Sequence, residues 1–309
     1  MDMATIVVTG ATGTIGNAVC KHLLERGDQP VALSRDPATA TSRLPQGVRV
    51  QAWPEPQAQT APLDALDGAQ AVIHLLGEPI SQRWTEPVKQ RIRDSRVLST
   101  RMLTEAIGQL PGDRRPTVLI SQSATGYYGP RGGEELDEQA NPGDDFLARV
   151  VRDWEQEARR AEEHCRVAVM RTGVVLSRSG GALAKMLPFF RAGIGGPVAG
   201  GRQYVPWVHI DDVAAAMVHC IEDDGATGPL NVTAPHPVDN AEFSRALGRV
   251  LHRPALLPVP TLALKLLYGE MSVIVTTGQR AVPRRLTELG FRFANPEIGA
   301  ALAQVLSRS

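Results

Sequence analysis

The first 175 residues alternate between short apolar runs and stretches of helical periodicity. Continuous apolar runs predict strands over residues 5–8, 30–33, 48–53, 69–76, 117–120 and 167–171. Apolar side chains three or four positions apart predict the intervening helices, over residues 15–26, 85–110 and 145–163. Strands that alternate with helices are typical of a parallel sheet covered on both faces, with right-handed crossovers.

The pattern changes after residue 175. A glycine-rich region over 177–202 surrounds one expected helix, 182–191. Further along, the spacing predicts helices over 211–221, 242–251, 261–268, 278–289 and 296–306, with a short strand at 230–232. We therefore expect a large α/β domain over residues 1–252, with insertions near 177–207. A small, mostly α-helical segment is expected over 253–309.

Three glycines, Gly10, Gly13 and Gly16, stand between the first strand and the first helix. Glycines there let the backbone approach a pyrophosphate, and the helix N-terminus offers free N–H groups. The loop residues expected to bind a dinucleotide are Gly10, Thr12, Gly13, Thr14, Ile15 and Gly16. No Lys-Ser or Lys-Thr pair follows, so the loop is not that of a nucleoside triphosphatase. The alternative interpretation is that these glycines only form a turn.

The second strand ends in Ser34 and Arg35, where a site for NAD(H) places an acidic residue. A guanidinium instead suits the 2′-phosphate of NADP(H), and the serine adds a donor. We therefore expect NADP(H) rather than NAD(H) as the cofactor. The alternative is that Arg35 is merely exposed while Asp36 takes the acidic role.

Composition excludes several classes of protein. The chain has 33 basic and 33 acidic residues, and this zero net charge argues against a general binder of nucleic acids or acidic membranes. Three widely separated cysteines suit a reducing cytoplasm, and no Cys-x-x-Cys or His-x-x-x-His spacing predicts a metal site. No apolar run reaches the length of a membrane helix or a signal sequence. Dense charges of alternating sign over 149–166 predict a solvated helix face.

Several segments resemble the extended short-chain dehydrogenases. Residues 9–16 (TGATGTIG) match their T-G-x-x-G-x-x-G, 74–77 (HLLG) their H-x-A-G, and 121–129 (SQSATGYYG) their S-S-S-A-x-x-Y-G. The segment 207–213 (WVHIDDV) resembles their H-V-D-D motif. The resemblance implies a Rossmann-type, doubly wound parallel sheet. It also implies that further residues line the cofactor: Leu75, Leu76, Gly77, Ser121 and Arg171.

A narrower resemblance spans nearly the whole chain. Its segments are 77–80 (GEPI) with 83–84 (RW), 126–129 (GYYG), 171–176 (RTGVVL), 180–188 (GGALAKMLP), 201–204 (GRQY) and 278–280 (GQR). Together they are similar to a bacterial subfamily labelled epimerase-like or cell-division-inhibitor-like, with a C-terminal domain of unassigned function. The label fixes neither the substrate nor the reaction.

The chain departs from the superfamily at the catalytic residues. Ser123 matches the superfamily serine, but Tyr-x-x-x-Lys is absent from all positions of the chain. Phe146, Leu147, Val150 and Val151 stand where the tyrosine and lysine would fall, and Arg96 replaces the superfamily's asparagine. Apolar side chains can neither transfer a proton nor lower a tyrosine pKa.

Other residues are candidates for proton transfer. Ser123 can orient the reacting oxygen, or it can simply satisfy local backbone groups. Tyr127 and Tyr128 follow on the next loop, either as a phenolic acid/base or as partly buried aromatics. Lys185 is one of four lysines in a chain that otherwise uses arginine, and it is either a titrating amine or a solvated helix residue.

The candidate substrate-binding residues are Glu78, Arg202, Trp207 and His209. Glu78 follows the fourth strand, and ligands in such sheets bind at the strand carboxyl ends. The other three follow a Gly-Gly turn and can bind a carboxylate or phosphate. His209 is equally interpreted as a structural histidine beside Asp211 and Asp212, a pair that favours a helix N-cap.

Three functions agree with the sequence. The leading hypothesis is a cytoplasmic NADP(H)-dependent oxidoreductase that acts on a small carbonyl or hydroxyl compound. The second is an epimerase or dehydratase that returns the hydride to the same molecule, and the third is a non-catalytic NADP(H) sensor or scaffold. The resemblance further implies a homodimer through the helices at 85–110 and 145–163.

Overall fold

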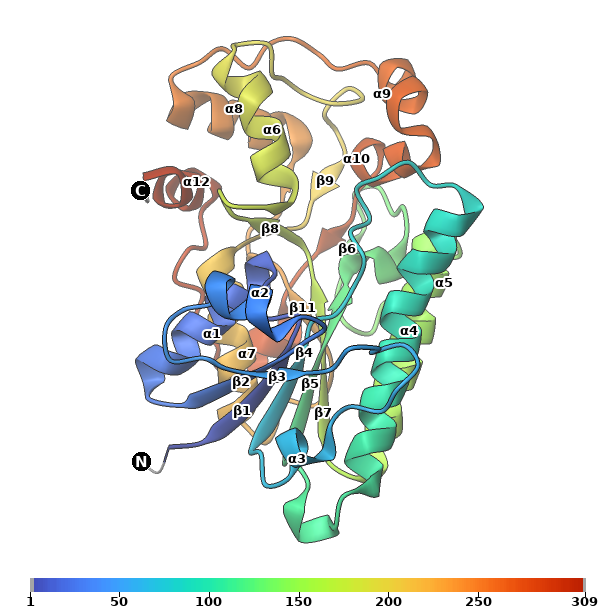
Figure 1. Ribbon diagram of the computed structural model, residues 1–309. Coiled ribbons are helices and arrows are strands. Elements are labelled where there is room, and N and C mark those ends of the chain that lie inside the picture. The colour runs from blue at the N-terminus through green and yellow to red at the C-terminus, as the bar shows by residue number, and fades with distance from the viewer. Residues whose placement is uncertain (1–2, 308–309) are drawn as a thin grey trace.

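A computed structural model describes residues 3–307 of the chain, and its centre is a seven-stranded parallel sheet (Figure 1). The strand order is β11-β7-β5-β4-β1-β2-β3. The strands are β1 (Thr5–Thr9), β2 (Gln29–Ser34), β3 (Arg49–Ala52), β4 (Ala71–His74), β5 (Val118–Ala124), β7 (Arg166–Thr172) and β11 (Gly228–Val232). The predicted α/β fold of Rossmann type is confirmed. The order reverses between β1 and β4, which opens a crevice at the carboxyl ends of the strands.

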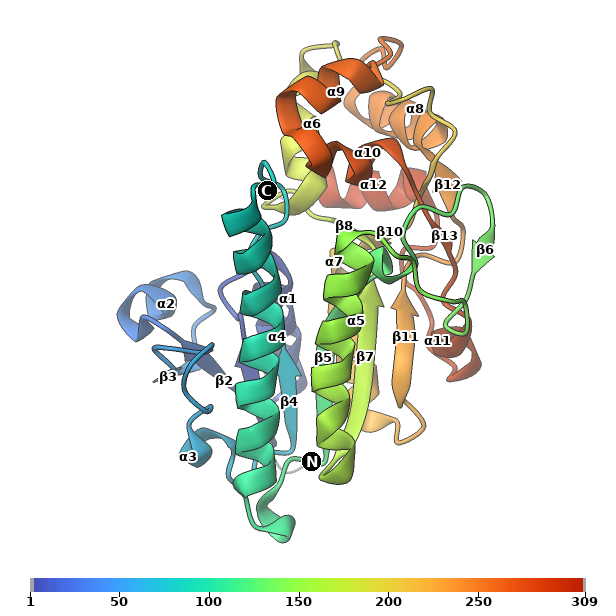
Figure 2. The same cartoon turned by 90° about the vertical axis from the view of Figure 1, so that its right-hand side faces the viewer.

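Alternate side chains of each strand enter two separate cores. Ile6 and Val8 pack beneath α1 (Thr14–Arg26) and α7 (Ile210–Glu222). Val7 faces the other way, toward the core under α4 (Glu86–Gln109) and α5 (Phe146–Arg159). Figure 2 shows α4 and α5 side by side over that face. Burial on both faces explains why these strands have continuous apolar sequences.

Short elements between the long ones were absent from the predictions. They are α2 (Pro37–Arg43), α3 (Leu63–Leu66), η1 (Gly112–Arg114), η2 (Thr125–Tyr128), β6 (Glu135–Leu136) and η3 (Arg160–Glu163). Each has two to seven residues, so none completes the two helical turns that a periodic pattern needs.

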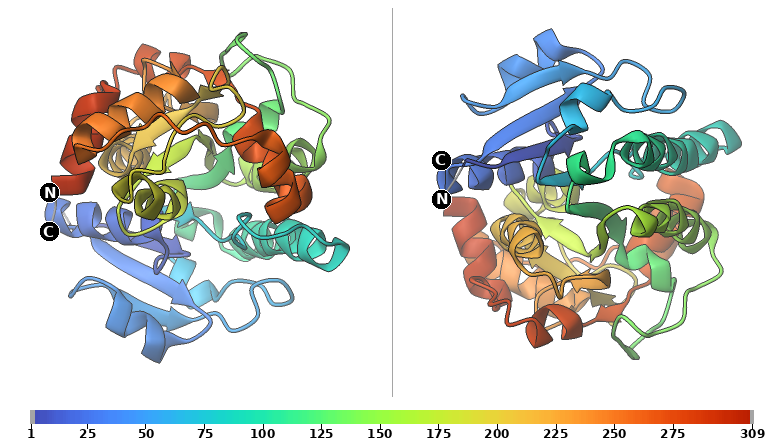
Figure 3. Two further views of the ribbon diagram at one scale, coloured as in Figure 1. Left: turned by 90° about the horizontal axis from the view of Figure 1, so that it is seen from above. Right: turned by 90° about the horizontal axis from the view of Figure 1, so that it is seen from below.

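A second lobe lies over the carboxyl ends of the strands (Figures 1 and 3). Its first part holds β8 (Val174–Leu176), α6 (Gly181–Arg191), β9 (Tyr204–Val205), β10 (Trp207–His209), β12 (Val238–Asp239) and α8 (Asn240–Leu251). Its last part holds α9 (Thr261–Tyr268), η4 (Gly269–Ser272), α10 (Val273–Thr276) and α12 (Ile298–Ser307). The core of this lobe joins α6, α8 and α12 through Leu183, Phe243 and Leu302.

The predicted helix over 278–289 is wrong in its first half. Residues Arg280–Ala281 form strand β13, which pairs in parallel with β6, and only Arg284–Glu288 is helical, as α11. Pro283 stands directly before α11 and cannot donate the backbone hydrogen bond of a continuous helix.

The C-terminal segment is built into both lobes. Leu286 of α11 is fully buried in the core beneath α1 and α7, and Leu302 of α12 is fully buried in the upper core. Between them, Asp212 of α7 accepts hydrogen bonds from the backbone N–H groups of Ala294 and Asn295, at 2.8 and 3.1 Å. Residues 284–307 therefore complete the sheet domain as well as the second lobe.

We expect Leu286→Ala to lower the free energy of unfolding by about 2–5 kcal/mol, because the shorter side chain leaves a cavity in a closed core. The control Leu63→Ala removes a leucine that is 38% exposed and should cost below about 1 kcal/mol. Chemical denaturation of the full chain measures both values. Equal losses in the two variants would show that α11 is not part of the main core.

Candidate functional site

The loop between β1 and α1 is shaped by contacts that only glycine permits. Gly10 has φ +66°, and a β-carbon on it would lie 2.8 Å from the carbonyl oxygen of Leu75 at the end of β4. A β-carbon on Gly16 would overlap the carbonyl oxygen of Gly10. A β-carbon on Gly13 would meet only that same oxygen, at 3.2 Å, so the outer side of the loop is open. No side chain caps α1 at Gly13, and its first turn has no acidic residue. The loop therefore fits the pyrophosphate of a dinucleotide.

The end of β2 favours a 2′-phosphate over a free ribose hydroxyl. The Asp36 carboxylate caps α2 by accepting a hydrogen bond from the backbone N–H of Thr39 at 3.1 Å, so it is already used within its own turn. Arg35 is exposed and makes no ion pair within residues 3–307. Ser34 Oγ accepts a hydrogen bond from the backbone N–H of Asp36. Arg35 is thus the charged group available to a ligand here.

A chain of hydrogen bonds fixes the strand ends behind this loop. The backbone N–H of Leu75 donates to Thr9 Oγ1, and Thr9 Oγ1 lies 2.8 Å from Nδ1 of His74. His74 Nε2 lies 3.0 Å from the hydroxyl of Thr100, which donates to the carbonyl of Arg96. Burial lowers the pKa of His74 to about 3, so the ring is neutral. With Thr9 donating to Nδ1, the proton sits on Nε2, and β1, β4 and α4 are tied together.

Arg96 holds the segment that follows β4. Its guanidinium donates to the carbonyl oxygens of Glu78 and Ile92, both at 3.0 Å. A β-carbon on Gly77 would lie 3.0 Å from that guanidinium, so glycine is needed for this close approach. Burial lowers the pKa of Arg96 to about 10, and the charge of Glu78 partly offsets this. Arg96, at the position of the superfamily's asparagine, therefore holds Gly77 and Glu78 at the crevice.

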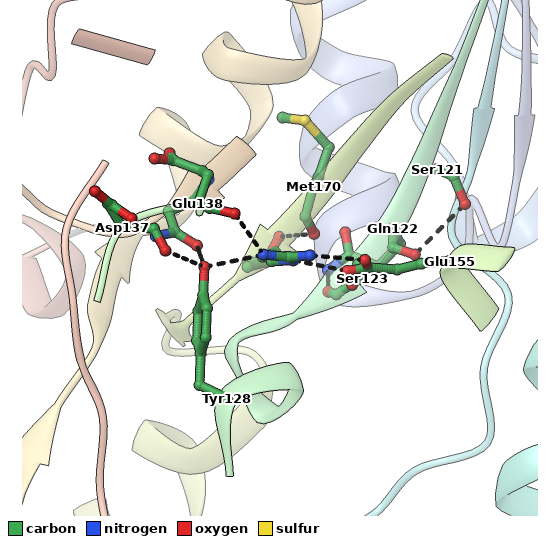
Figure 4. A network of polar contacts seen from close by, with 11 residues as sticks. Ser121, Gln122, Ser123, Tyr128, Asp137, Glu138, Glu155 and Met170 are labelled. Atoms are coloured by element: carbon green, nitrogen blue, oxygen red, sulfur yellow. Dashed lines mark hydrogen bonds and ion pairs between the residues drawn. The ribbon is translucent and has the colours of Figure 1, made fainter. Parts of the chain in front are cut away.

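A buried ion pair lies at the carboxyl ends of β5 and β7. Arg171 of β7 binds Glu155 of α5 through two hydrogen bonds, Nε to Oε1 at 2.8 Å and Nη2 to Oε2 at 2.9 Å. Ser123 donates its hydroxyl hydrogen to Glu155 Oε1 at 2.7 Å. Ser123 is 1%, Arg171 2% and Glu155 5% exposed. Figure 4 shows Ser123 and Glu155 together on one side of the network and Tyr128 and Glu138 on the other.

The two tyrosines of η2 have different environments. Tyr128 is fully buried, and its hydroxyl lies 2.7 Å from Asn231 Oδ1 and accepts from Arg171 Nη1 at 3.2 Å. Burial raises the pKa of Tyr128 to about 12, with the Arg171 charge opposing it. This favours the interpretation of Tyr128 as a buried loop aromatic. Tyr127 is half-buried, and the Arg171 guanidinium carbon lies 3.4 Å from its ring centroid. No hydrogen bond to its hydroxyl is formed within residues 3–307.

The positions that replace the superfamily's tyrosine and lysine belong to an apolar cluster. Val150 packs with Trp84, Ile92 and Met271, and Phe146 and Leu147 border the same cluster. The rings of Trp84 and Phe146 are 5.2 Å apart, edge to face. This cluster joins α4, α5 and η4, so the first turns of α5 serve in packing between the lobes rather than in proton transfer.

Helix α6 closes over the crevice from the second lobe. Gly180, directly before α6, lies against Thr14 of α1, and a β-carbon on it would overlap the threonine hydroxyl. Lys185 is exposed and donates to the side-chain and backbone oxygens of Ser81, on the segment after β4. Glu78 Oε1 accepts a hydrogen bond from Gln82 in that same segment. Lys185 and Glu78 therefore lie at the mouth of the crevice.

The remaining substrate candidates are not gathered there. Trp207 is 1% exposed and packs in the core of the second lobe. His209 is fully buried, and its Nδ1 accepts from the backbone N–H of Asp211, which makes His209 the N-cap of α7. The expected cap role of the Asp211–Asp212 pair is therefore wrong. Arg202 is exposed beyond the Gly-Gly turn.

Three residues of the buried network were missed by sequence reasoning: Glu155, Glu138 and Asn231. Glu155 lies within the charged run interpreted as a solvated face, and that interpretation is wrong at this position. The sequence held a usable indication, because Glu155 lies four residues after the apolar Val151 and so shares its helix face. Glu138 Oε1 accepts from the backbone N–H of Asn231 at 2.9 Å, and burial raises the pKa of Glu138.

Residues 3–307 contain neither a membrane-spanning helix nor a cluster of metal ligands. No helix is both long and apolar enough to cross a membrane. No group of three or more histidine, cysteine, aspartate or glutamate side chains is arranged to hold a metal ion.

The chain matches two family models and has relatives along its whole length. Residues 6–233 match the NAD dependent epimerase/dehydratase family, and residues 259–305 match a domain of unknown function, DUF1731. A chloroplastic epimerase family protein homologue of Arabidopsis thaliana is 39% identical over 306 residues, which cover 98% of this chain and 86% of the relative.

Two solved structures are similar in sequence and fold. A human epimerase family protein crystallised with NADPH is 35% identical with a TM-score of 0.88, covering 97% of this chain and 98% of that one. A nucleoside-diphosphate sugar epimerase from Corynebacterium glutamicum is 34% identical with a TM-score of 0.76. It is matched over 99% of this chain and 58% of its own.

We expect Glu155→Gln to lower the free energy of unfolding by about 3–5 kcal/mol, because it leaves the Arg171 charge buried without a counter-ion. Glu162→Gln is the matched control. Glu162 is exposed in η3, so this substitution should leave the free energy of unfolding nearly unchanged. Denaturant unfolding followed by circular dichroism gives both values. Equal stability of the two variants would contradict a structural role for the pair.

Proposed function

The chain belongs to the NAD dependent epimerase/dehydratase family, and from this premise we propose that it is an NADP(H)-dependent oxidoreductase of a small carbonyl or hydroxyl compound. The observation that carries the proposal is an open glycine loop together with Arg35, which makes no ion pair within residues 3–307 and lies beside an Asp36 already engaged in capping. A human relative crystallised with NADPH supports the same cofactor. When bound, that cofactor supplies or accepts a hydride, while the protein positions and protonates the substrate.

Ser123 and Tyr127 are the proposed polar groups at the reacting carbon. Because the Ser123 hydrogen points to Glu155, its oxygen faces other partners as an acceptor, which suits a substrate hydroxyl. Tyr127 has a hydroxyl without a partner in residues 3–307 and the Arg171 charge against its ring. The guanidinium packed on the ring holds Tyr127 in place and leaves its hydroxyl available to exchange a proton with the substrate. Tyr127 therefore takes the acid/base role in this proposal, and Tyr128 does not.

Lys185 and Glu78 are proposed to act at the entrance. The Lys185 bond to Ser81 links α6 to the segment after β4, so it holds the crevice closed around a bound ligand. Glu78 offers a carboxylate to polar groups of the substrate at the same entrance.

An epimerase or dehydratase is the second candidate, and the nucleoside-diphosphate sugar epimerase from Corynebacterium glutamicum favours it. Such an enzyme would return the hydride to its substrate and consume no NADPH overall. Mass spectrometry of products, beside the absorbance of NADPH, distinguishes the two. Tight NADPH binding with no turnover over broad substrate panels would instead support the sensor or scaffold.

We expect Arg35→Asp to weaken NADPH binding by about 10- to 100-fold relative to NADH, because a charge-assisted contact with the 2′-phosphate is replaced by repulsion. Arg49→Asp is the control, since Arg49 is an exposed arginine at the amino end of β3, away from the crevice. Titration calorimetry with both nucleotides measures the selectivity. An unchanged ratio in Arg35→Asp would rule out the 2′-phosphate assignment.

We expect Tyr127→Phe to reduce turnover by about 10²- to 10⁴-fold, because the variant keeps the ring on Arg171 and loses only the hydroxyl. NADPH affinity should stay unchanged. Tyr268→Phe, in an exposed tyrosine of α9, is the control and should keep full activity. Turnover is followed by the absorbance of NADPH on a substrate found by screening, and full activity in Tyr127→Phe would remove Tyr127 from the mechanism.

A further inference from the structure

Large exposed apolar side chains are concentrated in one part of the molecule. Of the eleven such side chains in residues 3–307, nine lie between Phe189 and Val275. Leu256 is 80%, Leu262 69% and Leu266 71% exposed. Helix α9 has no buried residue at all. Isolated exposed leucines are ordinary, but a concentration of this kind marks an interaction surface.

The segments that carry these side chains are held together by backbone contacts. Val198, after α6, forms a β-bridge with Val259, before α9. The backbone N–H of Val259 donates to the carbonyl of Pro197 at 2.9 Å, and that of Ala199 donates to the carbonyl of Val259 at 3.1 Å. The left panel of Figure 3 shows α6, the connection before α9 and α9 itself on the same side of the molecule. We call the exposed apolar side chains of these segments the apical face: Phe189, Ile194, Leu256, Leu257, Leu262, Leu266 and Leu267.

The charges on these segments all have one sign. Residues 181–203 and 252–269 contain no aspartate or glutamate. Their charged residues are Lys185, Arg191, Arg202, Arg253 and Lys265, all of them exposed. None of the five forms an ion pair within residues 3–307. The zero net charge of the chain is therefore an average that conceals a local excess of five positive charges.

We propose that the apical face docks on the surface of an anionic lipid bilayer. Leucine and phenylalanine side chains enter the boundary between headgroups and acyl chains, while Arg191, Arg253 and Lys265 contact the lipid phosphates. The expectation that the chain does not bind membranes followed from its net charge and from the lack of a spanning helix. Peripheral docking requires neither, because it depends on the local charge and on a few apolar side chains.

The charge pattern favours a bilayer over a second copy of the chain. In a two-fold dimer the same patch meets itself, so the five positive charges of one copy would face the five of the other. These segments carry no acidic residue to compensate them. An anionic surface is instead complementary to both properties of the face. Docking there also places the mouth of the crevice near the bilayer, because α6 carries Lys185 at that mouth.

Sedimentation of the full chain with vesicles tests the proposal. We expect binding to vesicles of equal parts phosphatidylcholine and phosphatidylglycerol, with far weaker binding to phosphatidylcholine alone and a decrease at high salt. Leu266→Ser with Leu267→Ser should weaken binding by about tenfold or more, and Lys265→Glu by about fivefold or more. These side chains are exposed, so the fold should be unaffected, and thermal unfolding checks this.

The matched controls lie outside the apical face. Leu63→Ser alters an exposed leucine of α3, and Lys21→Glu alters an exposed lysine of α1. Both should bind anionic vesicles as the unaltered chain does. The proposal is overturned by lack of binding to the vesicles that contain phosphatidylglycerol, or by equal losses in the control variants. It is also overturned if light scattering shows a dimer that Leu266→Ser with Leu267→Ser dissociates while vesicle binding is absent.

Discussion

The ion pair between Glu155 and Arg171 is the contact on which the functional end of the molecule depends. Two opposite charges removed from water carry a large desolvation cost, which is offset only when geometry is good and the remaining donors are satisfied. Here the pair is bidentate, Ser123 donates to the carboxylate, and the other side of the guanidinium contacts Tyr128 and the carbonyl of Glu138. One pair thus joins β5, β7, α5 and η2 at the carboxyl edge of the sheet. Hydrogen bonds that converge on one buried ion pair in this way favour a single arrangement of these elements, which is what a precise site requires.

Local sequence patterns were sufficient to predict the alternating strands and long helices of the sheet domain. The strands of the sheet are buried on both faces, so their sequences are continuous apolar runs. The loop after β1 has three glycines within seven residues, at positions where the backbone turns closely. Short strands that form only by pairing with a distant segment leave no such pattern in the sequence. Strand β13 has two residues and exists only because β6 lies beside it, so residues 280–281 resembled the start of a helix.

The candidate site also has residues that local sequence predicts and residues whose role depends on distant parts of the chain. The cofactor loop and Arg35 were proposed from local sequence, because each lies at the end of a predicted strand. The environments of Tyr127 and Tyr128 do not follow from sequence, because the two are adjacent in the chain and differ only in what lies around them. Arg171 covers the ring of one, and Asn231, more than a hundred residues away, binds the hydroxyl of the other. Likewise, Trp207 and His209 belong to a motif but are used for packing and helix capping.

The route of the C-terminal segment has a consequence for how the chain is made. The N-terminal part of a chain leaves the ribosome first, and domains usually fold as they emerge. In this protein Leu286 enters the core beneath α1 and α7, and Asp212 binds the backbone of Ala294 and Asn295. The sheet domain therefore stays incomplete during synthesis until residues 284–295 have left the ribosome. Docking of this segment thus completes the core of the sheet domain, and a premature stop codon before it would leave hydrophobic core residues exposed to proteases and chaperones.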